Sequence, residues 1–145
     1  MENRIKEINS FEDLEVWLQA RKIQRAIRKI TKRFPKIEQY RLADQMIRSS
    51  RSVARNIAEG YGRYHYQENI QFCRISRGSL NELKNDLITA HEEGFIEKNV
   101  LEKMEKEIEL NNRLLNGYIS YLYKAKNGNR VNDIQNVYKP KPDYR

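Results

Sequence analysis

Apolar side chains recur at alternating three- and four-residue steps along four long stretches of the sequence. This period is typical of amphipathic α-helices that bury one face, and it predicts helices over residues 12–33, 40–59, 67–93 and 98–126. The repeating positions are Val16, Ala20, Ile23, Ile27, Ile30 and Phe34; Ala43, Met46, Ile47, Ser50, Val53, Ala54, Ile57 and Ala58; Cys73, Ser76, Leu80, Leu83, Leu87 and Ala90; and Leu101, Met104, Ile108, Leu115, Tyr118 and Leu122. The pattern therefore predicts an all-α fold, an antiparallel up-down-up-down four-helix bundle.

The helical pattern divides the chain into three parts. Residues 1–10 show no sustained period and are predicted to be a frayed N-terminus, whereas residues 11–126 carry the four-helix bundle. Residues 127–145 are predicted to be an extended or disordered tail, because they contain two prolines and no helical period. One folded domain is expected, which suits a chain of 145 residues.

The end of the second predicted helix combines small side chains with two glycines. Small residues let a neighbouring helix approach closely, so this helix is expected to form the inner wall of the bundle. Glu59 is predicted to close the helix, and Gly60 and Gly62 to open a turn, since glycine adopts a positive φ without a Cβ penalty. Asn56 and Glu59 are predicted to hydrogen-bond the loop or a neighbouring helix end, with an Arg55–Glu59 pair as a further contact; a ligand site is the alternative.

Two of the predicted helices carry a second apolar stripe. Its positions are Phe72, Ile75 and Ser79 in the third helix and Leu110, Leu114 and Tyr121 in the fourth. Each helix of a monomeric bundle needs only one buried stripe, so a second stripe suggests a contact with a neighbouring subunit. Equally, these positions can widen the core of the monomer.

The net charge of +8 is unevenly distributed. Residues 21–77 carry fifteen basic and four acidic side chains, a net charge of +11, whereas residues 78–112 carry a net charge of −5. A strongly cationic segment is a candidate surface for a polyanion. The sequence has neither an apolar run long enough to span a membrane nor an N-terminal signal peptide, and these absences favour a cytoplasmic protein without a membrane partner.

Side chains that could carry catalysis or bind a metal are few and scattered. The two histidines, His65 and His91, lie far apart in the sequence, and the single cysteine, Cys73, falls on the apolar stripe and is expected to be a buried thiol. Glu82 and Asp86 share a helix face, but they suit a solvated face as well as an acid–base pair. We therefore expect a protein that is not an enzyme and needs no cofactor or metal.

Basic residues supply the strongest functional signal. The candidate nucleic-acid-binding residues are Arg21, Arg25, Arg28, Lys29, Lys32 and Arg33 in the first predicted helix; Arg41, Arg48, Arg51 and Arg55 in the second; and Arg63, Tyr64 and Tyr66 in the loop that follows. The loop alternates aromatic and cationic side chains, a composition suited to stacking bases while holding phosphates. The alternative is a solvated basic face whose tyrosines and part of whose arginines contact a neighbouring subunit.

Short motifs at fixed spacing match a known family over about residues 11–125. They are Phe11–Trp17, Phe34-Pro35, Arg48–Ser50, Asn56–Gly60, Gly62-Arg63, Glu68, Phe72, Arg74-Ile75, Gly78–Leu80, Glu82-Leu83, Gly94 and Arg113–Ile119. With these motifs the chain resembles the bacterial four helix bundle proteins, also called the 23S ribosomal RNA intervening-sequence protein family.

The resemblance implies a left-handed antiparallel four-helix bundle that assembles as a homopentameric ring. Some members are encoded by insertions within 23S ribosomal RNA genes. The family is also similar in fold to accessory proteins of diversity-generating retroelements, which are basic pentamers associated with a reverse transcriptase and nucleic acid. The chain departs from the family pattern at Ala54, where proline is frequent, at His65, where a small hydroxyl residue caps the third helix, and at Asn69, where a large apolar residue is usual.

These observations lead to one main hypothesis and one alternative. The main hypothesis is a non-enzymatic homo-oligomer whose basic surface binds the backbone of RNA or DNA, as an accessory factor to a reverse transcriptase or another nucleic-acid enzyme. The alternative is a structural or protein-interaction module whose charge serves assembly and solubility only.

Overall fold

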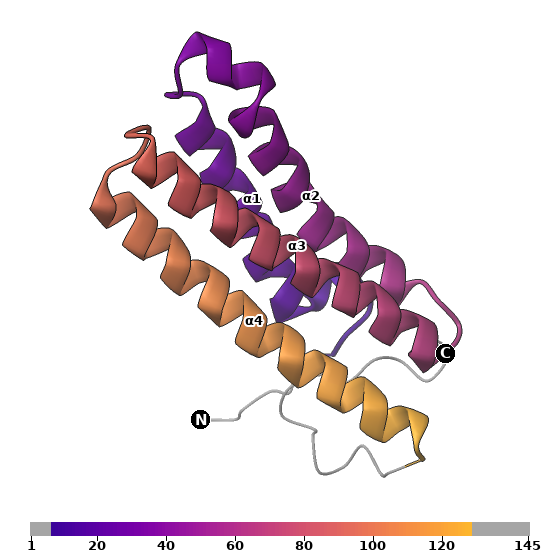
Figure 1. Ribbon diagram of the computed structural model, residues 1–145. Helices are drawn as coiled ribbons and strands as arrows, with labels where there is room; N and C mark the ends of the chain where they lie inside the picture. The colour runs from indigo at the N-terminus through magenta and orange to yellow at the C-terminus, as the bar shows by residue number, and fades with distance from the viewer. Residues whose placement is uncertain (1–6, 129–145) are drawn as a thin grey trace.

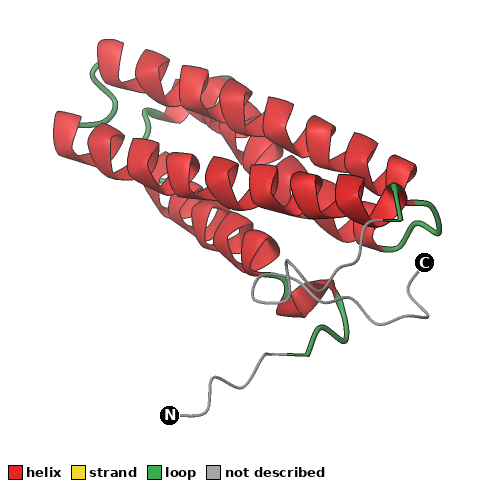
Figure 2. Cartoon of the chain, turned by 90° about the horizontal axis from the view of Figure 1, so that it is seen from below, coloured by secondary structure: helices red, strands yellow, loops and turns green. Residues whose placement is uncertain are grey.

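The computed structural model describes residues 7–128, and within that range every regular element is helical (Figures 1 and 2). Four long α-helices lie side by side, joined by short connections, and two of these helices are preceded by a 3₁₀ turn (Figure 1). The elements are η1 (Phe11–Asp13), α1 (Glu15–Thr31), η2 (Lys36–Tyr40), α2 (Leu42–Tyr61), α3 (Tyr66–Glu92) and α4 (Lys98–Lys126). The all-α fold with four helices predicted from the sequence is confirmed.

The apolar stripes form a single core between the four helices. Every position of the predicted stripes in α3 and α4 is buried, and in α1 only Ile30 is half-buried. In α2, Ile47 and Ala58 are half-buried and the other stripe positions are buried. No helix within residues 7–128 combines the length and the apolar composition that crossing a membrane requires.

The start of the chain is packed more closely than its sequence indicates. Ile8 is buried in the core, and Ser10 forms a capping box with Asp13 at η1. Leu14 then adopts an extended conformation, so α1 begins at Glu15 and not at residue 12. The predicted frayed N-terminus does not extend to residues 7–10, and the rest of that segment lies outside the described residues.

Contacts between helices pair rising residue numbers in one helix with falling numbers in the next. Along α2 and α3, the Gln45 side chain donates to Asp86, and the hydroxyls of Ser52 and Ser79 are 2.8 Å apart. Between α1 and α4, Asn111 donates to the carbonyl of Val16. These buried or half-buried polar contacts fix how each helix lies along its neighbour.

Gly60 and Gly62 do not play the role that the sequence predicts. α2 runs through Gly60 to Tyr61, Gly62 has φ −76°, and the glycines with positive φ in the described chain are Gly94 and Gly128. Gly94 follows α3, where the amide of Phe95 donates to the carbonyl of Ala90 at 2.8 Å, so a glycine with positive φ caps this helix end.

Gly60 is instead required by a close helix contact. A Cβ at this position would lie 2.6 Å from Oδ1 of Asn69 and 2.9 Å from Cβ of Phe72, both on α3. Asn69 is buried and donates to the Tyr118 hydroxyl of α4 at 3.0 Å. Because Gly60 has no side chain, α2 can lie directly against Asn69 of α3, and Asn69 in turn bonds Tyr118 of α4.

The second apolar stripes divide between core and surface. Tyr121 and Ser79 are buried and widen the core, and Phe72 and Leu114 are half-buried. Ile75 and Leu110 remain exposed, at 53% and 38% of their surface. The core-widening interpretation therefore holds for Tyr121 and Ser79, whereas a subunit contact at Ile75 and Leu110 stays a prediction.

Candidate nucleic-acid interface

Four cations of α1 follow one face of the helix. Arg21, Arg25, Arg28 and Lys32 are spaced by four, three and four residues, which places them in one row over three helical turns. The buried stripe of α1 lies on another face, so Arg25, Arg28 and Lys32 are exposed, and Arg21 is half-buried with its guanidinium 5.5 Å from the Trp17 ring centre.

Three of these cations line a groove between α1 and α2 with a volume of about 360 Å³. The α1 side is formed by five residues and the α2 side by three. The lining residues are Gln24, Arg25, Arg28, Lys29 and Lys32 from α1, and Ile47, Ser50 and Arg51 from α2. We call this the α1–α2 groove.

The α1–α2 groove concentrates positive charge without a compensating acid. Five of its eight lining residues are cationic and none is acidic. Within residues 7–128, none of these five cations forms an ion pair, whereas Lys22, Arg48 and Arg63 each pair with a carboxylate. Like charges held close together attract an anion that binds several of them at once.

The remaining predicted cations lie outside this groove. Arg48 pairs with Asp44 at 3.2 Å, Arg41 precedes the first turn of α2, and Arg55 is exposed. Arg33 lines a separate cavity of about 490 Å³, together with Lys29 and residues at the start of α4. The seven-residue spacing of Arg41, Arg48 and Arg55 therefore misses the α2 cation that joins the groove, which is Arg51.

The aromatic loop does not join the groove either. It follows Tyr61, the last residue of α2, which lies ten residues beyond Arg51, or about 15 Å along the helix axis. Tyr66 is half-buried against the core, and Tyr64 is exposed, with its ring edge-on to His65 at 4.9 Å. Arg63 stacks over Phe72 at 4.7 Å and pairs with Glu59 at 3.0 Å.

Asn56 and Glu59 have structural contacts. The Asn56 amide donates to the carbonyl and to the hydroxyl of Ser52, at 2.7 and 2.9 Å, and Ser52 in turn contacts Ser79 of α3. The predicted Arg55–Glu59 pair is wrong, because Glu59 pairs with Arg63 one turn later in the chain. Asn56 thus bonds within its own helix, and neither residue contributes to the α1–α2 groove.

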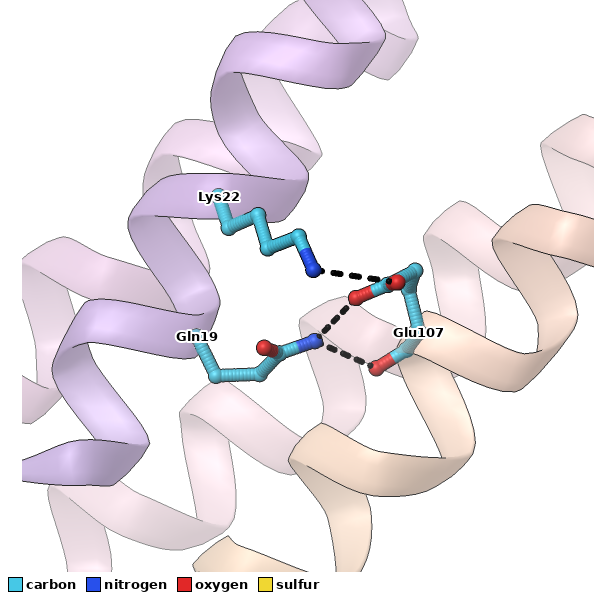
Figure 3. Close-up of polar contacts among 3 residues, drawn as sticks. All are labelled: Gln19, Lys22 and Glu107. Carbon is cyan, nitrogen blue, oxygen red and sulfur yellow. Dashed lines mark hydrogen bonds and ion pairs between the residues drawn. The ribbon is translucent and has the colours of Figure 1, made fainter.

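A polar clasp of Gln19, Lys22 and Glu107 fixes α1 against α4 (Figure 3). Gln19 Nε2 donates to the Glu107 carbonyl at 3.1 Å and to its Oε2 at 2.6 Å, and Lys22 Nζ lies 3.3 Å from Oε1. The hydrogen bond from Gln19, followed by the contacts with Lys22, lowers the pKa of the Glu107 carboxyl and keeps it ionised. The clasp positions α1, and hence its row of cations.

The side chains considered for catalysis are buried or contact the backbone. Cys73 is buried, and burial raises the pKa of its thiol to about 12, so the nucleophilic thiolate is not formed at neutral pH. His91 Nδ1 lies 3.2 Å from the Ile96 carbonyl at the end of α3. The interpretation of Asp86 as part of a solvated face is wrong, because Asp86 is buried beside α2.

Sequence reasoning missed two exposed side chains at one end of the groove. Ile37 and Tyr40 of η2 are 63% and 88% exposed, although both are large and apolar. Residue 37 lies between two predicted helices and residue 40 at the start of one, so the helical pattern gave neither residue a functional role. The signal in the sequence was Pro35 followed by apolar residues three apart, a spacing that a 3₁₀ turn places on one side.

The fold defines the class as an all-α protein of four helices, and comparison with family models identifies the particular family. The model for the 23S rRNA-intervening sequence protein matches residues 12–117. The chain therefore belongs to this family, as its motifs indicate. A comparison with curated proteins gave no match.

Proposed function

We propose that this protein is a non-enzymatic, homo-oligomeric accessory factor that binds the phosphate backbone of RNA or DNA through the α1–α2 groove. The observation that carries the proposal is the convergence of Arg25, Arg28, Lys29 and Lys32 of α1 with Arg51 of α2 on one groove without a lining acid. The family name, which refers to an RNA sequence, is compatible with an RNA-related role.

The proposed assembly is a homopentameric ring of antiparallel up-down-up-down bundles. The opposed residue numbering of the contacts between helices supports the antiparallel order. Exposed apolar residues support a subunit contact: Leu18 of α1 and Leu110 of α4 line a shallow groove with half-buried Leu114. A ring would repeat the α1–α2 groove in every subunit, which raises avidity for a long polyanion.

A cytoplasmic setting and a partner enzyme complete the proposal. The likeness to retroelement accessory proteins favours a reverse transcriptase or another enzyme that acts on nucleic acid. In such a pair the bundle would hold the nucleic acid, and the partner would carry out the chemistry.

Salt dependence tests backbone binding directly. Binding of a fluorescein-labelled 20-base-pair RNA duplex, followed by anisotropy from low to physiological salt, should weaken steeply, because each neutralised phosphate releases counterions. The triple variant Arg25→Gln, Arg28→Gln, Lys32→Gln should bind all sequences more weakly and flatten the slope of log K against log salt by up to about 3.

A charge-matched control separates the groove from net charge. Lys84→Gln, Lys103→Gln, Lys106→Gln removes the same three charges from exposed positions on α3 and α4. It should leave the slope nearly unchanged. Equal loss in the two triple variants, or no binding at physiological salt, would refute the proposed site.

A second candidate function, a structural or interaction module without a nucleic-acid ligand, rests on the exposed Ile75 and Leu110. Under this alternative, duplex binding vanishes near physiological salt, while Ile75→Ser or Leu110→Ser lowers the oligomer mass. Light scattering coupled to size exclusion measures that mass on the same samples.

A further inference from the structure

Tyr40 stands out as an aromatic ring presented to solvent. It is 88% exposed, and Ile37, three residues earlier, is 63% exposed. In a 3₁₀ helix, side chains three residues apart lie on the same side, so the two form one apolar surface on η2. A large exposed apolar pair indicates a contact with a ligand or partner.

The turn that carries Tyr40 is held rigidly. Gln39 Nε2 donates to the carbonyls of Thr31 and Phe34, at 2.9 and 3.0 Å, and so satisfies carbonyls at the end of α1. The Phe34 side chain is buried in the core. η2 is therefore clamped to α1, and Tyr40 projects from a fixed platform.

The clamp also places Tyr40 at one end of the α1–α2 groove. Gln39 precedes Tyr40 directly, and its partner Thr31 precedes Lys32, which lines the groove. Two further cations are exposed nearby in the sequence: Lys36 is the first residue of η2, and Arg41 directly follows its last residue. Tyr40 thus has cationic neighbours in the sequence, and the Gln39 hydrogen bonds hold its turn against the end of α1, where the row of cations ends.

We propose that Tyr40 stacks on an unpaired base next to a duplex segment whose backbone lies in the α1–α2 groove. The ligand class is RNA or DNA with a junction between double and single strand. The groove is lined by cations and carries no aromatic ring, so it suits a phosphate backbone, whereas the η2 surface offers a flat ring beside cations, as in platforms for unstacked bases. This inference rests on the proposed function and deepens it.

Tyr40 is a candidate stacking residue that the sequence did not predict. Of the predicted stacking residues, Tyr64 belongs to the α2–α3 loop and Tyr66 is the first residue of α3. This loop and η2 lie at opposite ends of α2 (Figure 1). Tyr66 is half-buried against the core, so only Tyr64 is exposed there. Tyr64 is therefore the matched control for Tyr40.

Two pairs of labelled probes test the inference. One pair consists of a blunt 20-base-pair RNA duplex and the same duplex with four unpaired adenosines at one end; the other is its DNA equivalent. The wild-type protein should bind the extended probe about 5- to 150-fold more tightly than the blunt one, the range expected for stacking of one base. A preference in only one pair would identify the nucleic acid.

Single-residue variants show which tyrosine causes the preference for the extended probe. Tyr40→Ala should abolish it and leave blunt-duplex affinity unchanged, whereas Tyr40→Phe and Tyr64→Ala should retain it. Because Tyr40 is almost fully exposed, Tyr40→Ala should keep the helical circular dichroism and the oligomer mass of the wild type.

Failure of the inference is distinguishable from failure of the proposed function. Equal binding of blunt and extended probes by the wild type, or an unchanged preference in Tyr40→Ala, overturns the role of Tyr40 while backbone binding stands. A smaller oligomer in Tyr40→Ala, with no preference in the wild type, would make the η2 surface a contact between copies. Binding of neither probe overturns the inference and the proposed function together.

Discussion

The two flanks of α2 are built in different ways. Towards α3, short contacts are made by small or uncharged residues. Gly60 lies against Asn69, the Ser76 hydroxyl donates to the Val53 carbonyl at 2.8 Å, and Ser52 contacts Ser79. Towards α1, the rim is lined by long cationic side chains and remains open as a groove. Small residues allow two helices to approach closely, whereas like charges on facing rims keep a gap.

The difference means that the α3 flank of α2 contributes to the stability of the bundle, whereas its α1 flank is the side proposed to bind a ligand. On the α3 flank the Ser52, Ser76 and Asn69 side chains have their partners within the protein, so a substitution there leaves a clash or an unmade bond. On the α1 flank the partners of the cations are missing from the described chain, so a substitution there removes repulsion. The same kind of change should therefore have opposite effects on the two flanks.

The largest effect is expected from Gly60→Ala. The added Cβ would overlap Asn69 and the Cβ of Phe72, which cannot move without its helix, so α2 and α3 must shift apart. We expect a loss of about 1–3 kcal/mol in the free energy of unfolding, measured by urea denaturation.

Gly78→Ala is the matched control for Gly60→Ala. Gly78 lies within α3 and no atom stands within 4 Å of a Cβ built there. Alanine should stabilise this helix by about 0.5–1 kcal/mol, because it reduces the entropy of the unfolded chain. A stabilising Gly60→Ala would show that the α2–α3 flank is not closely packed.

Gly60 also illustrates what periodicity can and cannot predict. The apolar pattern identified four helices and their buried faces, because burial repeats with the helical turn. It could not distinguish a glycine that ends a helix from one that admits a neighbour, since the neighbour, Asn69, belongs to the next helix and its approach depends on how the two helices pack. The end of α2 was therefore misplaced by two residues, whereas α4 was bounded correctly by the glycine-containing segments on both sides.

The sequence likewise predicted only part of the candidate site. The spacing of Arg25, Arg28 and Lys32 was sufficient to place them on one face of α1. Which cation of α2 joins them depends on the side of α2 that faces α1, and a seven-residue spacing does not contain that information. Arg51 was one of four candidate cations in the second predicted helix, and only the groove distinguishes it from the others, whereas Tyr40 emerged only from the packing of η2 through the Gln39 clamp.

A smaller effect, dependent on pH, is expected at Asp86 on the α3 flank. Burial, and then the negative charge of Glu82, raise the pKa of the Asp86 carboxyl above 3.8, against hydrogen bonds from Asn85 and Gln45 that lower it. The folded protein therefore holds this proton more firmly than the unfolded chain. Its contribution to stability is fully present below pH 3.8 and is lost as the pH rises through the raised value.

Asp86→Asn should remove this dependence. The gain in unfolding free energy of the variant over the wild type should be greater at pH 7 than at pH 4, as measured by urea denaturation at both values. Glu109→Gln removes one exposed carboxylate from α4 and reports the effect of net charge alone. A gain that is larger at pH 4 would mean that the buried carboxylate is stabilised by its surroundings.

The smallest effect on stability, and the sharpest contrast with Gly60, is expected from Arg51→Gln on the α1 flank. Arg51 faces four cations of α1 across the groove and forms no ion pair within residues 7–128, so its removal relieves repulsion. The variant should be more stable than the wild type by about 0.2–0.5 kcal/mol at low salt. The gain should vanish in 1 M salt, where the screening length is about 3 Å.

The same variant should lower the salt slope of duplex binding by about 1, the loss of one phosphate contact. Arg55→Gln, one turn further along α2 and outside the groove, should change neither quantity. If Arg51→Gln instead cost more than about 0.5 kcal/mol, the groove would be a packed contact like the α3 flank.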